Sequence, residues 1–130
     1  MAVSACGASA GTTPKAVNVG GAQVPVAQLS SVLGGLCDTR RAGTDAVSAR
    51  TAFYNHAHEN LHVLATATEV PDRRAAGRLL EAMQRVEADL APVGDRTLLP
   101  THVNELLRTA RASLDRLDIP SRSCQEADTR

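Results

Sequence analysis

The sequence predicts an all-α fold, an up-down-up-down four-helix bundle with one disulfide. Apolar residues recur at spacings of three and four along four separate segments, which is the period of an amphipathic helix. The chain is rich in Ala and Leu but holds only one Phe, one Tyr and no Trp, a composition that favours helix over strand. No alternation of apolar and polar residues indicates a strand. At 130 residues, the chain allows one domain with one core.

The first helix is expected to begin after Pro25, since proline is well suited to the N-terminal position of a helix, and to end at Gly43. Its apolar stripe consists of Val26, Leu29, Leu33 and Leu36. The Gly34-Gly35 pair within this helix costs about 1 kcal/mol per glycine relative to Ala. Such a cost is tolerated where another backbone must come close, so the pair predicts a close contact with a neighbouring helix.

The other three helices are expected over about residues 45–68, from Pro71 to about Pro92, and from about Pro100 to Pro120. Thr44 or Asp45 is expected to cap the first of these. The clearest apolar period lies in the helix after Pro71 and comprises Ala76, Leu79, Met83, Val86 and Leu90. Phe53 and Tyr54 supply all the aromatic area of the chain, and both are expected to fill the core.

Residues 1–23 consist mostly of Gly, Ala, Ser, Thr and Val and predict a flexible tether, followed by a helical domain over 24–130. Within the tether, Val3-Ser4-Ala5-Cys6 resembles the lipobox of bacterial lipoproteins of the actinobacterial type. The resemblance implies acylation of Cys6 and an extracytoplasmic, membrane-anchored location. Only five residues precede Cys6, fewer than a signal peptide needs, so we expect the native precursor to begin further upstream.

The cysteine count agrees with that location. If Cys6 carries lipid, Cys37 and Cys124 remain to form one disulfide, which points to an oxidising compartment. Closing this loop would stabilise the fold by about 4–5 kcal/mol in the chain-entropy model. The bridge requires the segment after the fourth helix to turn back along the surface of the bundle. The alternative is a cytosolic protein with three buried thiols.

Charge and hydropathy exclude two classes of protein. The formal net charge is zero, whereas a general nucleic-acid binder needs an excess of Lys and Arg. No apolar run approaches the eighteen or so residues of a membrane-spanning helix. The lipobox resemblance implies instead two partners, a membrane surface reached through the lipid anchor and another protein of the cell envelope.

The most suggestive stretch, from His58 to His62, matches the pattern H-E-x-x-H and resembles the zincins over five residues. Positions four apart lie one turn above each other on a helix, so His58 and His62 can share a metal. The sequence therefore predicts a site for zinc or copper at His58, His62 and Glu59. His56 projects from the other side of the helix and His102 is expected near a distant end of the bundle, so neither should join the site.

Three interpretations remain open. The leading one is a small accessory or binding lipoprotein without enzymatic activity that holds a transition metal. The zincin resemblance implies instead a minimal zinc peptidase, with Glu59 as general base towards a zinc-bound water. Its third ligand would be Glu81 or Glu87, although Glu81 lies away from the apolar stripe of its helix. The third interpretation is a structural or partner-binding envelope module in which the histidines form a solvated helix flank.

Overall fold

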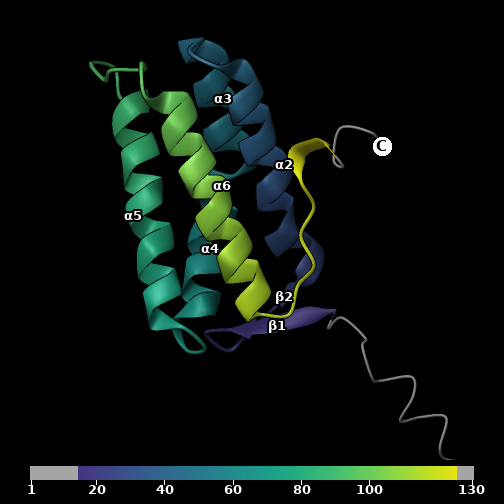
Figure 1. Ribbon diagram of the computed structural model, residues 1–130. Helices are drawn as coiled ribbons and strands as arrows, with labels where there is room; N and C mark the ends of the chain where they lie inside the picture. Colours follow the sequence, from purple (N-terminus) through teal and green to yellow (C-terminus); the bar gives the residue numbers. More distant parts are fainter. Residues whose placement is uncertain (1–14, 126–130) are drawn as a thin grey trace, which may run out of the picture.

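The computed structural model describes residues 15–125, so Cys6 and the lipobox lie outside the described residues. Within this range the fold is mostly helical (Figure 1). Its elements in chain order are strands β1 (Ala16–Val19) and β2 (Ala22–Pro25) and helices α2 (Val26–Ala42), α3 (Ala46–His56), α4 (His58–Glu69), α5 (Arg73–Leu90) and α6 (Leu99–Arg116).

The two strands correct the prediction of an all-α fold. β1 and β2 pair antiparallel, with Val17 opposite Val24, and both valines pack against the helical core. Gly20 and Gly21 join the strands with φ angles of 59° and 90°, a left-handed conformation that glycine adopts at no steric cost. The hairpin thus occupies the last part of the segment that the sequence analysis assigns to a tether.

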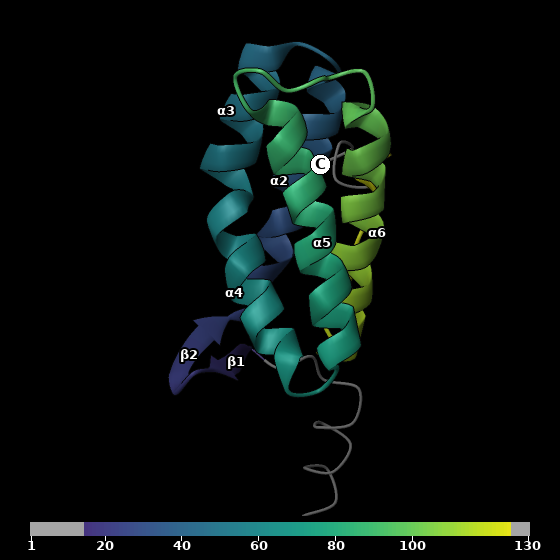
Figure 2. The same cartoon turned by 90° about the vertical axis from the view of Figure 1, so that its left-hand side faces the viewer.

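The helices differ from the prediction in number, because five are present among the described residues instead of four. The helix expected over 45–68 is divided at Ala57, whose φ is −136°, and α3 and α4 follow one another across this junction. α2 and α5 run in one direction, whereas α3, α4 and α6 run in the other (Figures 1 and 2). The core lies between them, and its largest fully buried side chains are Phe53, Leu29, Leu36, Leu61, Leu64, Leu79, Met83, Leu90, Leu99, Leu106, Leu107 and Leu114.

The predicted close contact of the first helix is confirmed at Gly35. A Cβ atom on this residue would lie 2.3 Å from the carbonyl oxygen of His56 and 2.9 Å from the Cβ of Ala57. The backbone of α2 therefore meets the α3–α4 junction directly, and a side chain at Gly35 would push the two apart. Gly34, its neighbour, faces open space.

Polar contacts join α5 and α6 near both ends. Asp72 caps α5 by accepting a bond from the Ala75 N–H at 3.0 Å, and its carboxylate also meets Arg116 of α6 at 2.8 Å. The bond from Ala75, together with the charge of Arg116, lowers the pKa of Asp72. Towards the other end, Nδ1 of His102 lies 2.5 Å from Oδ2 of Asp89.

The segment after α6 turns back along α2 (Figure 1), as the predicted bridge requires. It brings the sulfur of Cys124 to 2.13 Å from that of Cys37, with the two Cα atoms 5.5 Å apart. The predicted cysteine pair is therefore confirmed at disulfide distance. Both residues are buried, so the pair ties the last described segment to the middle of the first helix.

Replacing the two adjacent glycines should have opposite effects on stability. Gly35→Ala should lower the free energy of unfolding by about 1–3 kcal/mol, because the new methyl group overpacks the contact with His56. Gly34→Ala should raise it by about 0.5–1 kcal/mol, because alanine is the better helix former and meets no neighbour. Urea denaturation followed by circular dichroism measures both. Equal effects of the two changes would contradict the contact.

Removing the cross-link should be costly. The double variant Cys37→Ala/Cys124→Ala should lose about 4–5 kcal/mol of unfolding free energy, since the bridge joins residues 87 apart in sequence and restricts the unfolded chain. Cys6→Ala is the matched control, because it removes a thiol but no cross-link. Intact mass before and after reduction tests the bond itself, and an unchanged mass would show that the two cysteines are not joined.

Candidate metal site

Four side chains follow one another at four-residue steps along α3 and α4 and lie on one face. The guanidinium carbon of Arg50 lies 5.4 Å from the ring centre of Tyr54. The rings of Tyr54 and His58 are 5.0 Å apart, and those of His58 and His62 are 4.8 Å apart. Arg50 also donates a hydrogen bond to the carbonyl oxygen of Leu90 in α5. The row therefore continues across the helix junction and faces α5.

Glu87 of α5 completes the cluster. Its Oε2 atom lies 2.8 Å from Nε2 of His58. His58, His62 and Glu87 each offer one ligand atom, and these atoms all lie within 4.8 Å of one another. Two ligands at about 2.0–2.2 Å from one zinc ion are at most about 4.4 Å apart, so small side-chain rotations would bring all three onto a single ion. His62 is exposed, whereas His58 and Glu87 are half-buried.

The structure brings together two of the three predicted ligands. His58 and His62 share the cluster, but Glu59 is exposed and is not a member of the group found among residues 15–125. The carboxylate in that group is Glu87, which the sequence analysis names only as a third ligand of the peptidase interpretation. The sequence held a signal for this residue. Glu87 directly follows Val86 and precedes Leu90 by three positions, and both belong to the predicted apolar stripe, so Glu87 should lie at the edge of that stripe.

The remaining histidines lie elsewhere, as expected. His56 is exposed at the end of α3, and His102 pairs with Asp89. Neither belongs to the cluster found in the described part of the chain.

Tyr54 belongs to the site and not to the core, which corrects the expectation for this residue. Phe53 is completely buried, whereas Tyr54 is 37% exposed. Partial burial and the negative charge of Glu87 raise the pKa of the Tyr54 phenol, and the positive charge of Arg50 opposes this rise. As the one tyrosine of a chain without tryptophan, Tyr54 is an intrinsic spectroscopic reporter beside His58.

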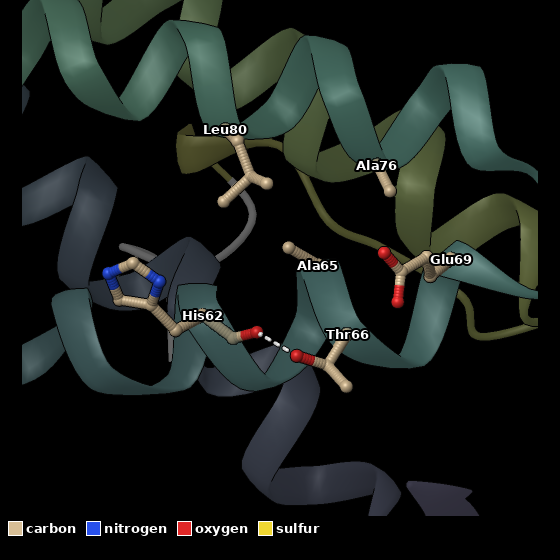
Figure 3. Close-up of a pocket in the computed structure, with 6 residues that line it drawn as sticks. All are labelled: His62, Ala65, Thr66, Glu69, Ala76 and Leu80. Atoms are coloured by element: carbon tan, nitrogen blue, oxygen red, sulfur yellow. Dashed lines mark hydrogen bonds between the residues drawn. The ribbon is translucent and has the colours of Figure 1, made fainter. Parts of the chain in front are cut away.

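A groove between α4 and α5 begins beside the cluster (Figure 3). It has a volume of about 170 Å³ and is lined by His62, Ala65, Thr66, Glu69, Ala76 and Leu80. Pockets for drug-sized ligands measure roughly 300–1,000 Å³. This groove therefore suits a small molecule better than a peptide.

Comparisons of the chain with family models, curated proteins and solved structures gave no match. Among residues 15–125, none of the helices combines the length and apolar character that crossing a membrane requires.

The raised pKa of Tyr54 provides a test of the cluster geometry. Glu87→Gln should lower that pKa, because the variant removes a nearby negative charge, while burial keeps part of the rise. An ultraviolet pH titration of phenolate absorbance measures the change, with Glu81→Gln as the control on the same helix. Because folding raises the pKa of Tyr54, the neutral phenol contributes to the free energy of unfolding. This contribution is complete below the unfolded pKa of about 10 and is lost as the pH rises through the higher pKa of the folded state. Identical titrations of both variants would contradict the contact.

Proposed function

We propose that this chain is a small extracytoplasmic, lipid-anchored accessory protein that binds a divalent transition metal through His58, His62 and Glu87. One observation carries the proposal: two imidazoles and a carboxylate from adjacent helices present their ligand atoms within 4.8 Å of one another. The i, i+4 spacing on α4 places His58 and His62 next to each other. The packing of α4 against α5 brings Glu87 to them.

The donor set indicates which metals would bind. Imidazole nitrogen suits Zn²⁺, Cu²⁺ and Ni²⁺, and a carboxylate oxygen favours a divalent ion over the soft Cu⁺. No cysteine belongs to the cluster found among residues 15–125. Cys37 and Cys124 are paired with each other, and Met83 is buried in the core. The proposed ligand is therefore a divalent transition-metal ion, and zinc and oxidised copper are the two that we propose to test.

The hydrogen bond between His58 and Glu87 has a consequence for binding. An ion bound at Nε2 of His58 would take the place of a proton on that nitrogen, since a metal-bound imidazole must be deprotonated at the ligating nitrogen. Metal uptake should therefore release protons, and affinity should fall on acidification.

The proposed location rests on two features. The Val3-Ser4-Ala5-Cys6 motif has the residue pattern of a lipobox, and Cys37 and Cys124 lie at the distance of a disulfide, a bond typical of oxidising compartments. A lipid on Cys6 would hold the domain at a membrane surface, where an envelope protein is the expected partner. The balanced formal charge argues against a nucleic-acid partner.

Peptidase activity is a weaker candidate, favoured by one observation. Two histidines and a downstream glutamate form a ligand set that zinc peptidases use, and Glu87 supplies that glutamate here. However, Glu59, which would have to act as the base, is outside the cluster of the described residues, and the adjacent groove is small. Binding without catalysis therefore accounts better for the geometry.

Titration with Cu²⁺ should quench the fluorescence of Tyr54, because the phenol ring lies beside the proposed ligand His58. Zinc does not quench in this way, so calorimetry should be used to measure the binding of Zn²⁺. His62→Ala and Glu87→Gln should each lower the metal affinity by at least roughly 10- to 100-fold. That is the loss seen when a residue that only hydrogen-bonds to a metal ligand is removed, and these two residues are proposed as ligands themselves. Every sample should carry Cys6→Ser, because a free thiol would itself bind these metals.

His56→Ala is the matched control, since it removes an exposed histidine one residue before the helix junction without touching the cluster. Its affinity should equal that of the parent. Glu59→Gln should also bind normally, and the zinc-loaded parent should not cleave casein. Equal affinity of the His56, His62 and Glu87 variants would refute the site, whereas cleavage that depends on Glu59 would establish the peptidase.

A further inference from the structure

The groove beside the cluster has chemically different ends. His62 lies at one end and the Glu69 carboxylate at the other, with the side chains of Ala65 and Leu80 between them and that of Ala76 across from Glu69 (Figure 3). The two end residues are seven positions apart on α4, which corresponds to about 10.5 Å along the helix axis. The groove therefore leads from a metal ligand to a negative charge over two helical turns.

The middle of the groove is apolar. Ala65 and Ala76 are buried and Leu80 is partly exposed, so their methyl groups form its walls. The Thr66 hydroxyl donates its one hydrogen to the carbonyl oxygen of His62 at 3.1 Å, so it can only accept a further hydrogen bond. Methylene groups of a ligand would fit the middle of the groove, because the side chains of Ala65, Ala76 and Leu80 that line it are apolar.

Glu69 is available for a cationic group. No ion pair or hydrogen bond engages its carboxylate within residues 15–125. An ammonium or guanidinium group at that end of the groove would gain an opposite charge at the cost of little desolvation, because Glu69 is exposed. Ion pairs of this kind contribute modestly, but they discriminate between a charged ligand and its neutral analogue.

The other end requires a metal-binding group. Three protein ligands leave one position open on a four-coordinate zinc ion and two on a five-coordinate one. An amino-carboxylate can fill these two positions through its nitrogen and its oxygen. We propose that this groove binds a small basic amino acid, whose amino-carboxylate head chelates the bound metal and whose cationic side chain reaches Glu69. This inference rests on the proposed metal site, and it assigns to that site a co-ligand of defined chemistry.

L-lysine and L-norleucine are the probes, because they share the amino-carboxylate head and a four-carbon side chain but only lysine ends in a cation. Calorimetric titration into the zinc-loaded protein should show lysine binding about two- to fivefold more tightly, the effect of one exposed ion pair. Both probes chelate free zinc through the same head, so any removal of zinc from the protein affects the two titrations alike.

Variants then assign the preference to Glu69. Glu69→Gln should make the two affinities equal, whereas Glu81→Gln, an exposed glutamate outside the groove, should retain the preference for lysine. Circular dichroism checks that each variant is folded, and the comparison within the wild type needs no variant at all. In metal-free protein, neither probe should bind.

The outcomes separate this inference from the proposed function. Equal affinity for lysine and norleucine in the wild type, or a preference that survives Glu69→Gln, overturns the inference while leaving metal binding intact. Failure of zinc to bind in the first step overturns both. Lysine binding that is unchanged without metal would reduce the groove to a simple cation site and would likewise contradict the chelation proposed here.

Discussion

The close contact between α2 and the α3–α4 junction is the constraint on which the site depends. Gly35 lies so near the carbonyl oxygen of His56 that even a methyl group would not fit. This contact fixes where the chain passes from α3 to α4. It therefore also fixes the position along α5 that His58, the first residue of α4, can reach. Without it, the two helices could merge or shift, and the four-residue row that includes Tyr54 and His62 would lose its common face.

The cysteine pair complements this contact from the other side of the first helix. Cys37 follows Gly35 by two residues, so the cross-link to Cys124 and the contact with the junction act on the same turns of α2. Neither involves the cluster of His58, His62 and Glu87, which lies where α4 faces α5. The scaffold is thus held together by the core, the glycine contact and the cross-link, none of which involves His58, His62 or Glu87.

The sequence was informative where one short-range rule dominated. Helix periods located the four helical segments but not the break at Ala57 that divides the second of them into α3 and α4. The glycine pair revealed the close approach, and counting cysteines identified the pair. The hairpin was missed although Gly20-Gly21 lies between two short alternating runs, a known turn signal, because four-residue strands carry little periodicity. Glu87 was not separated from Glu59 because the choice depends on how α5 is rotated against α4, which a helical wheel of one segment cannot give.

The break at Ala57 explains why the predicted polar stripe was only half correct. On a continuous helix, His58, Glu59 and His62 form one polar flank, and all three are predicted as metal ligands. In the structure the half-buried edge of that flank, at His58, packs beside Tyr54 and receives Glu87, while Glu59 remains exposed. What distinguishes the two acidic residues is therefore not their distance along the chain but which of them a neighbouring helix faces. A carboxylate brought in by a second helix also makes the ligand set depend on tertiary packing, so any metal affinity should appear only in the folded chain.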